Sequence, residues 1–229
     1  MSTKFHLERL PLALAAVMLV GCSEPEHVSF PTEDGGVIHA DMYGNGDHGV
    51  VLAHGGQFNK ESWVTQAQAF AKAGFRALAI DFRGRGQSKG GPQITSQDDV
   101  RFDVLAAVRY LHGTGADTVS VVGGSFGGWA AAQAAVEAKE GEIDRIVLLA
   151  APAIDEPERM KGRKLFITTR DDFRGGGVLR LPEIRGQYER VRDPKQLVIL
   201  EGAAHAQHIF GTDQGERLMD EILRFLSEP

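Results

Sequence analysis

A serine flanked by glycines is the group in this sequence best suited to covalent chemistry. Ser125 lies in the run 123–127 (GGSFG), after an apolar β-branched segment at 118–122 and before an alanine-rich segment at 129–138. These segments predict a strand and a helix, with Ser125 in the turn between them. A Gly-x-Ser-x-Gly turn strains the serine backbone and needs small flanking residues, so that strand and helix can approach each other. The pattern predicts that Ser125 is a nucleophile.

The same turn offers groups that stabilise negative charge. When Ser125 attacks a carbonyl group, the carbonyl oxygen becomes an oxyanion. The amide of Phe126 and the N-terminus of the predicted helix point to the place where that oxyanion forms. We therefore expect the Phe126 amide to be one donor of an oxyanion hole.

The composition is that of an ordinary globular protein. The chain has 229 residues, of which 42% are apolar and 24% are charged, enough for one α/β domain with a sizeable core. A formal net charge of −6 argues against a nucleic-acid partner. No cluster of histidine, cysteine and carboxylate has metal-ligand spacing, and no glycine-rich phosphate loop precedes a lysine. We therefore expect no metal and no nucleotide cofactor.

The first residues have the pattern of an export signal. Lys4 and Arg9 give a positive start, and the apolar stretch 10–20 is too short to span a bilayer. The stretch ends in 19–22 (LVGC), which resembles the lipobox of bacterial lipoproteins, where the cysteine is lipidated and becomes the new N-terminus. Cys22 is the only cysteine of the chain, so it cannot form an internal disulfide.

This pattern predicts a signal peptide over 1–21 and a lipid-anchored tether over 22–26. The protein would then be exported and held at a membrane of a bacterial cell envelope through lipid on Cys22. Ser23 resembles the residue that, in bacteria with two membranes, sends a lipoprotein to the periplasmic side of the outer membrane. The alternatives are a plain secretory signal cut nearby and a buried thiol.

Strand-like and helix-like segments alternate after the tether, which predicts a mostly parallel sheet with helices on both faces. The expected strands lie at 28–30, 37–43, 49–53, 76–80, 118–123, 143–150, 164–168 and 196–200, the first two antiparallel. The expected helices lie at 63–73, 98–112, 126–140, 182–191 and 215–226, with Asp98 and Pro182 in suitable start positions. The short, proline-broken segment 151–163 leaves no room for a large lid.

Two further segments, together with the Ser125 turn, resemble the α/β-hydrolase family over essentially the whole chain after the tether. Residues 53–57 (AHGGQ) are similar to the His-Gly loop of the family, whose backbone amide supplies a second oxyanion donor. Residues 81–88 (DFRGRGQS) are similar to a turn that is largely structural in the family. The resemblance implies that the second donor is the amide of Gly56, with Gln57 as the alternative.

The family order of nucleophile, carboxylate and histidine implies which residue is the acid. Two aspartates follow the predicted strand in the segment 165–172 (LFITTRDD). If the strand ends at Thr168, the usual four-residue step reaches Asp172. Asp171 is the alternative, since strand ends are uncertain by a residue or more.

The same order implies which histidine is the base. The predicted strand 196–200 continues into 201–205 (EGAAH), which resembles the Gly-x-x-His ending of the family. His205 would take the proton of Ser125 and return it to the leaving group, while the acid fixes the imidazole tautomer. His208, three residues later, is the competing candidate.

The resemblance implies an α/β-hydrolase domain over 27–229, of the small lid-poor esterase or dienelactone-hydrolase type, with an eight-stranded sheet and no large cap. The implied reaction is cleavage of an ester or a related small acyl compound through an acyl-enzyme. A peptidase or amidase and a thioesterase share the same residues and stay open. The non-enzymatic alternative is a catalytically silent envelope binding protein of the same fold. The oligomeric state cannot be predicted.

Overall fold

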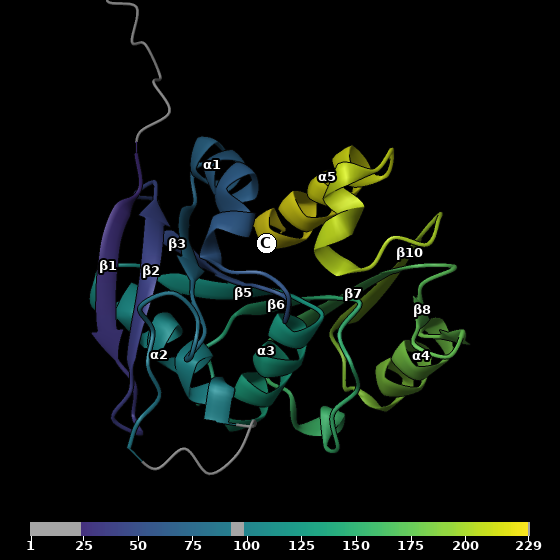
Figure 1. Cartoon of the computed structure of the whole chain (residues 1–229), viewed down its shortest axis with the longest axis horizontal. Coiled ribbons are helices and arrows are strands. Elements are labelled where there is room, and N and C mark those ends of the chain that lie inside the picture. The colour runs from purple at the N-terminus through teal and green to yellow at the C-terminus, as the bar shows by residue number, and fades with distance from the viewer. Residues whose placement is uncertain (1–23, 93–98, 229) are drawn as a thin grey trace, which may run out of the picture.

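The computed structural model describes residues 24–92 and 99–228, and its centre is the expected eight-stranded, mostly parallel sheet (Figure 1). The strand order is β1-β2-β4-β3-β5-β6-β7-β10. Strand β2 pairs antiparallel with β1 and β4, and the other neighbours pair in parallel. The strands are β1 (Glu26–Pro31), β2 (Val37–Tyr43), β3 (His48–Ala53), β4 (Arg76–Ile80), β5 (Thr118–Gly124), β6 (Arg145–Leu149), β7 (Arg163–Thr169) and β10 (Lys195–Leu200).

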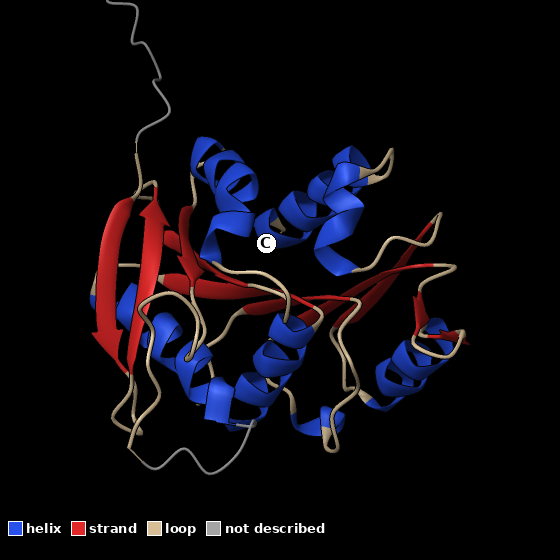
Figure 2. Cartoon of the chain, in the orientation of Figure 1, coloured by secondary structure: helices blue, strands red, loops and turns tan. Residues whose placement is uncertain are grey.

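Helices cover both faces of the sheet, as predicted (Figure 2). Helices α1 and α5 lie on one face, and α2, α3 and α4 lie on the other (Figure 1). The two groups contribute side chains to two separate apolar clusters, one on each face. The helices are α1 (Val64–Lys72), α2 (Val100–Gly113), α3 (Phe126–Glu137), α4 (Leu181–Arg190) and α5 (Gly215–Ser227).

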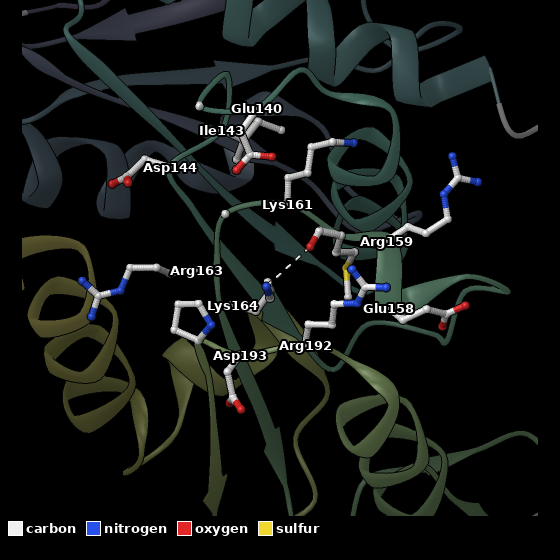
Figure 3. Close-up of a pocket in the computed structure, with 14 residues that line it drawn as sticks. Glu140, Ile143, Asp144, Glu158, Arg159, Lys161, Arg163, Lys164, Arg192 and Asp193 are labelled. Carbon is white, nitrogen blue, oxygen red and sulfur yellow. Dashed lines mark hydrogen bonds between the residues drawn. The ribbon is translucent and has the colours of Figure 1, made fainter.

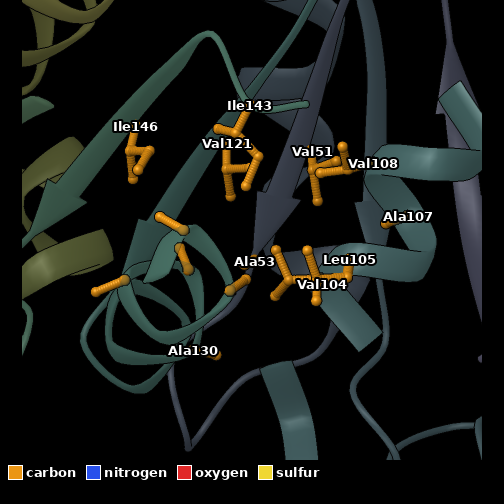
Figure 4. Close-up of a cluster of buried hydrophobic side chains, with 14 of the residues drawn as sticks. Val51, Ala53, Val104, Leu105, Ala107, Val108, Val121, Ala130, Ile143 and Ile146 are labelled. Atoms are coloured by element: carbon orange, nitrogen blue, oxygen red, sulfur yellow. The ribbon is translucent and has the colours of Figure 1, made fainter. Parts of the chain in front are cut away.

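The larger apolar cluster lies between the sheet and the helices α2 and α3 (Figure 4). Val51 and Val121 from adjacent strands face Val104 and Val108 of α2, and all four side chains are fully buried. Helix α3 contributes mostly alanines to this contact, so its backbone packs close to the strands. The close contact fixes where α3 begins, and therefore where the turn before it lies.

No cap domain is inserted between these elements within residues 24–92 and 99–228. The connections include three 3₁₀ segments, Lys60–Trp63, Pro157–Arg159 and Ala206–Gly211, and a two-stranded hairpin made of β8 (Phe173–Arg174) and β9 (Val178–Leu179). The hairpin was not predicted from the sequence. None of the described helices is long and apolar enough to cross a membrane.

The predicted elements agree with the structure to within a few residues at their ends. The largest differences are β1, which is longer than predicted at both ends, β6, which is shorter at both ends, and α3, which ends at Glu137 because Ala138 is extended. The predicted helix start at Asp98 lies outside the described residues. The signal peptide over 1–21 and the lipid on Cys22 also lie outside them, and both stay predictions.

Arg83 joins three parts of the fold at the turn after β4. Its guanidinium donates to Asp34, in the β1–β2 connection, at 2.6 and 3.1 Å, and to Asp103 of α2 at 2.7 and 2.9 Å. The amide of Arg83 adds a third hydrogen bond to Asp103, at 2.9 Å. The Asp103 side chain is fully buried, so its carboxylate depends on these donors. The turn at 81–88 is thus held by a buried ion pair.

We expect Arg83→Met to destabilise the fold by about 3–5 kcal/mol, because it leaves a buried carboxylate without its cation. Urea unfolding followed by circular dichroism measures the change. Asp34→Asn is the matched control, and its cost should be about 1 kcal/mol or less, since Asp34 is partly exposed. Equal costs for the two variants would contradict this account.

Candidate active site

Ser125 lies in a sharp turn between β5 and α3, as predicted. Its backbone has φ +50° and ψ −115°, a strained conformation for a residue with a side chain. The amide of Ser125 donates to Leu149 O at 2.8 Å, and its carbonyl oxygen accepts a hydrogen bond from Trp129 N at 3.0 Å. The backbone is therefore held from both sides, by the neighbouring strand β6 and by the first turn of α3.

The glycines around Ser125 are required by close packing rather than by their φ angles. A Cβ atom on Gly123 would lie 2.4 Å from Gly127 O, and a Cβ atom on Gly127 would lie 2.1 Å from Ala53 O. Both distances are far below van der Waals contact. No side chain fits where α3 crosses the ends of β3 and β5, which explains the spacing in the sequence.

The structure brings His205 and Asp172 to Ser125 in one hydrogen-bonded chain. His205 Nε2 lies 2.8 Å from Ser125 Oγ, and His205 Nδ1 lies 2.6 Å from Asp172 Oδ2. The Asp172 side chain is 1% exposed, whereas that of His205 is 27% exposed. Of the two aspartates left open by the sequence, Asp172 is the one that contacts the histidine.

The competing candidates have other contacts. Asp171 is exposed, and its amide donates to Gly202 O at 2.9 Å. His208 is also exposed, with its ring 5.1 Å from the ring of Phe58. Neither side chain belongs to the hydrogen-bonded chain that includes Ser125.

Parallel strand pairing explains why the acid and the base meet. Strands β7 and β10 are neighbours, so the segments that follow them leave the sheet at the same edge. Two hydrogen bonds continue the pairing past the strands, from Arg170 N to Leu200 O at 2.9 Å and from Thr169 Oγ1 to Ala204 O at 2.8 Å. These bonds fix the loop that carries His205 next to the acid.

Arg180 is a site residue that was not predicted from the sequence. Its Nε lies 3.4 Å from Asp172 Oδ1, the carboxylate oxygen that does not face His205. Its amide also donates to Asp172 O at 2.9 Å, across the base of the β8–β9 hairpin. This pairing depends on the β8–β9 hairpin, which brings Arg180 back to Asp172. Because the hairpin was not predicted, the pairing could not be predicted either.

The His-Gly loop lies beside the Ser125 turn. A Cβ atom on Gly56 would lie 3.7 Å from Phe126 Cβ, so the two residues expected to supply oxyanion donors are neighbours. Phe126 is the first residue of α3, where amide groups have no acceptor within the helix. Two backbone amides at this place suit the binding of a carbonyl oxygen that gains negative charge.

His54 fixes the shape of this loop. Its Nδ1 donates to Gly55 O at 2.8 Å, and its Nε2 accepts a hydrogen bond from Phe82 N at 3.3 Å. The side chain is buried, and burial lowers the pKa of His54, which favours the neutral ring that these two bonds require. His54 therefore connects the His-Gly loop to the turn after β4.

A cavity of about 240 Å³ lies next to the residues of the expected oxyanion hole. Its walls include Gly56 and Phe126, the aromatic ring of Phe82, and Arg85, whose guanidinium donates to Gly56 O. The remaining lining residues are His54, Arg83 and Val100. Ser125 is the chain neighbour of Phe126, so the cavity lies beside the turn that carries the serine.

A larger cavity, of about 580 Å³, lies at the edge of the sheet where β7 begins (Figure 3). The reactive groups at Ser125 lie beyond the other ends of the strands, so this cavity is remote from them. Lys164 reaches it with a side chain that is almost completely buried, and its ammonium group donates a long hydrogen bond, 3.4 Å, to Met160 O. Burial lowers the pKa of Lys164 below its usual value of 10.5.

Comparison with known proteins gives both a family and a fold. A model described as the alpha/beta hydrolase family matches residues 50–220. A 2-hydroxy-6-oxononadienedioate/2-hydroxy-6-oxononatrienedioate hydrolase of Burkholderia vietnamiensis is 31% identical over 115 residues, 49% of this chain and 39% of that protein. A bifunctional esterase/perhydrolase of Acinetobacter calcoaceticus is 33% identical over 121 residues, 52% of this chain and 43% of that protein. The chain thus matches less than half the length of these relatives.

Solved structures show the same fold. An esterase of Pyrococcus furiosus superposes with a TM-score of 0.74 at 21% identity, over 89% of this chain and 92% of that one. An esterase of Exiguobacterium antarcticum superposes with a TM-score of 0.70 at 14% identity, over 89% of this chain and all of that one (100%). The predicted α/β-hydrolase fold is confirmed.

The buried position of Lys164 gives a prediction about pH. Between the lowered pKa of the folded chain and 10.5, the unfolded chain binds more protons at this residue, so rising pH stabilises the folded state. We expect Lys164→Met to be more stable than the wild type at pH 7, with an advantage that shrinks towards pH 10. Melting temperatures at both pH values measure this. The exposed Lys72→Met is the control, and an advantage of Lys164→Met that does not change with pH would contradict the prediction.

Proposed function

The chain belongs to the alpha/beta hydrolase family, and from that premise we propose that it is a serine hydrolase that cleaves carboxylic esters or related small acyl compounds. The family and the relatives named as hydrolases and esterases support hydrolysis. The observation that carries the proposal is the hydrogen-bonded chain from Ser125 through His205 to Asp172. That arrangement supplies an activated nucleophile at a backbone turn that exposes it.

In the proposed reaction, Ser125 Oγ attacks the carbonyl carbon of the substrate. His205 Nε2 accepts the proton of the serine as the new C–O bond forms, and the imidazolium stays next to the Asp172 carboxylate. The carbonyl oxygen becomes an oxyanion that accepts hydrogen bonds from the amides of Gly56 and Phe126. In enzymes of this kind, removal of one such donor costs about 10²–10³ in rate.

Collapse of this intermediate releases the leaving group, which takes the proton from His205. The acyl group is then bound to Ser125 as an ester. His205 next removes a proton from a water molecule, the resulting hydroxide attacks the acyl-enzyme, and the proton returns to Ser125. These steps use groups that the chain itself supplies.

The size of the site favours small acyl groups. The cavity beside Gly56 and Phe126 has a volume of about 240 Å³. This is below the range of about 300–1,000 Å³ that is usual for pockets that bury drug-sized ligands. No inserted cap covers the site within the described residues, so little apolar surface is available to enclose a long chain. The aromatic rings of Phe82 and Phe126 give the cavity an apolar side.

We expect a fluorophosphonate probe to label the purified chain at one serine. Ser125→Ala should abolish labelling because it removes the nucleophile, and His205→Ala should slow it by at least about 10²-fold because it removes the base. Intact-mass spectrometry measures the adduct. Asp171→Asn is the matched control for Asp172→Asn, since only Asp172 contacts His205, and only Asp172→Asn should slow labelling.

Absence of labelling in folded wild-type chain would overturn the enzymatic proposal and favour a silent binding protein of this fold. Labelling that survives Ser125→Ala would show that another serine reacts. Once labelling is established, turnover of matched ester, thioester and amide substrates decides between an esterase, a thioesterase and an amidase.

We expect turnover of nitrophenyl esters to fall as the acyl chain grows, because a cavity of about 240 Å³ cannot enclose a long chain. Acetate and butyrate esters should exceed decanoate and longer esters by at least about tenfold in kcat/KM, one tenfold step being about 1.4 kcal/mol of transition-state binding. Measurements below the critical micelle concentration of each ester keep the comparison valid. Faster turnover of the long esters would contradict a small-acyl site.

A further inference from the structure

Gln207 is a polar residue that connects three segments around the candidate active site. Its Oε1 accepts a hydrogen bond from Gly55 N at 2.6 Å, and its Nε2 donates to Ser62 Oγ at 2.9 Å. Gly55 belongs to the His-Gly loop, Ser62 lies in the 3₁₀ segment Lys60–Trp63, and Gln207 itself is two residues after His205. One side chain thus joins the loop of the base to the loop of the expected oxyanion hole.

The donors and acceptors around Gln207 determine which way its side-chain amide is oriented. The amide of Gly55 can only donate, so the oxygen of the glutamine side chain must face it. The side-chain nitrogen then faces Ser62 Oγ, which is free to accept because the Ser62 hydroxyl donates to Asn59 O at 2.6 Å. Among the common side chains, a primary amide provides this acceptor and this donor without adding charge.

The local backbone is arranged around the same side chain. Ala206, between His205 and Gln207, has φ +48°, a left-handed conformation that is unfavourable for a residue with a Cβ atom. A Cβ atom on Gly124, just before the nucleophile, would lie 3.1 Å from Gln207 Cγ and 3.2 Å from its Oε1. The Gln207 side chain therefore fills the space that Gly124 leaves open, and packs directly beside the Ser125 turn.

We propose that Gln207 is a positioning residue for the oxyanion hole, which sets the Gly56 amide through its hydrogen bond to Gly55 N. The inference rests on the proposed function, since it concerns the same reaction. The His-Gly loop has two adjacent glycines, Gly55 and Gly56, whose backbone rotates with little steric restraint. The loop therefore needs contacts with other segments to hold one conformation. Gln207 supplies such a contact from the loop that also carries His205, in addition to the hydrogen bonds of His54 to Gly55 O and of Arg85 to Gly56 O.

The consequence is that the base and the oxyanion donor keep a fixed separation. A displacement of the Gly56 amide by a fraction of an ångström weakens its hydrogen bond to the oxyanion more than its contact with the neutral substrate, because the bond strengthens as charge develops. Loss of Gln207 is therefore expected to act on kcat rather than on KM. The side-chain amide of Gln207 is engaged by Gly55 N and Ser62 Oγ, so the residue acts through the loop and not on the reacting atoms.

The test compares Gln207→Leu with the wild-type full chain on a short nitrophenyl ester. We expect kcat to fall about 10–100-fold and KM to stay within about twofold, the size of effect typical of a misplaced group near a reaction centre. Gln214→Leu is the matched control. It makes the same change at the residue directly before α5, outside the segment Ala206–Gly211, and its kcat should equal that of the wild type. Ser62→Ala removes the bond from Gln207 Nε2 and the bond of the Ser62 hydroxyl to Asn59 O, but it keeps the bond from Gly55 N to Gln207. It should therefore cost less in kcat than Gln207→Leu.

A second measurement separates positioning from a general loss of structure. In a thionoester the carbonyl oxygen is replaced by sulfur, a weak hydrogen-bond acceptor, so its hydrolysis depends less on the oxyanion donors. The ratio of ester to thionoester rates should fall at least about fivefold in Gln207→Leu. A partly unfolded variant would lose both rates equally and keep the ratio.

The outcomes distinguish this inference from the proposed function. If the wild type hydrolyses the ester and Gln207→Leu matches it in kcat and in the rate ratio, the role of Gln207 is overturned and the hydrolase proposal stands. If both rates fall equally, Gln207 has only a structural role and the inference is again overturned. If the wild type neither hydrolyses esters nor reacts with a fluorophosphonate, the proposed function fails first.

Discussion

The structure depends on the close contact between the start of α3 and the ends of β3 and β5. The backbones approach so closely at Gly123 and Gly127 that even a methyl group would overlap a carbonyl oxygen. This contact forces the strained conformation of Ser125, directs its side chain away from the sheet and sets the first amide of α3 beside the His-Gly loop. The nucleophile is therefore positioned by steric exclusion, and the other groups are brought to it by strand pairing.

Most of the fold could be predicted because its signals are local. Apolar β-branched runs and amphipathic helices can each be recognised within a short stretch of sequence. All eight strands of the main sheet were therefore predicted near their observed bounds. The Ser125 turn could also be predicted, because its close packing requires glycines at fixed spacing around the serine. His205 could be predicted from the Gly-x-x-His segment that follows β10.

The contacts that cross between distant segments could not be predicted. The choice between Asp171 and Asp172 depends on how far β7 extends and on the hairpin after it, which is a matter of register rather than of residue type. Arg180 lies eight residues after Asp172, and Gln207 lies two residues after His205. Each contacts the site only because the fold brings its loop next to another segment. A surface arginine or glutamine looks the same in the sequence whether it is solvated or bound.

The β8–β9 hairpin begins directly after Asp172 and ends directly before Arg180, whose amide closes it with a hydrogen bond to Asp172 O. Its turn contains three consecutive glycines, 175–177, and the side chains of Phe173, Val178 and Leu179 are exposed. Because the closure lies at the base, the tip can change in length or composition without shifting the acid. Insertions at this tip would change the surface next to the acid, so the hairpin is a place where the surroundings of the acid can vary while the acid itself stays fixed.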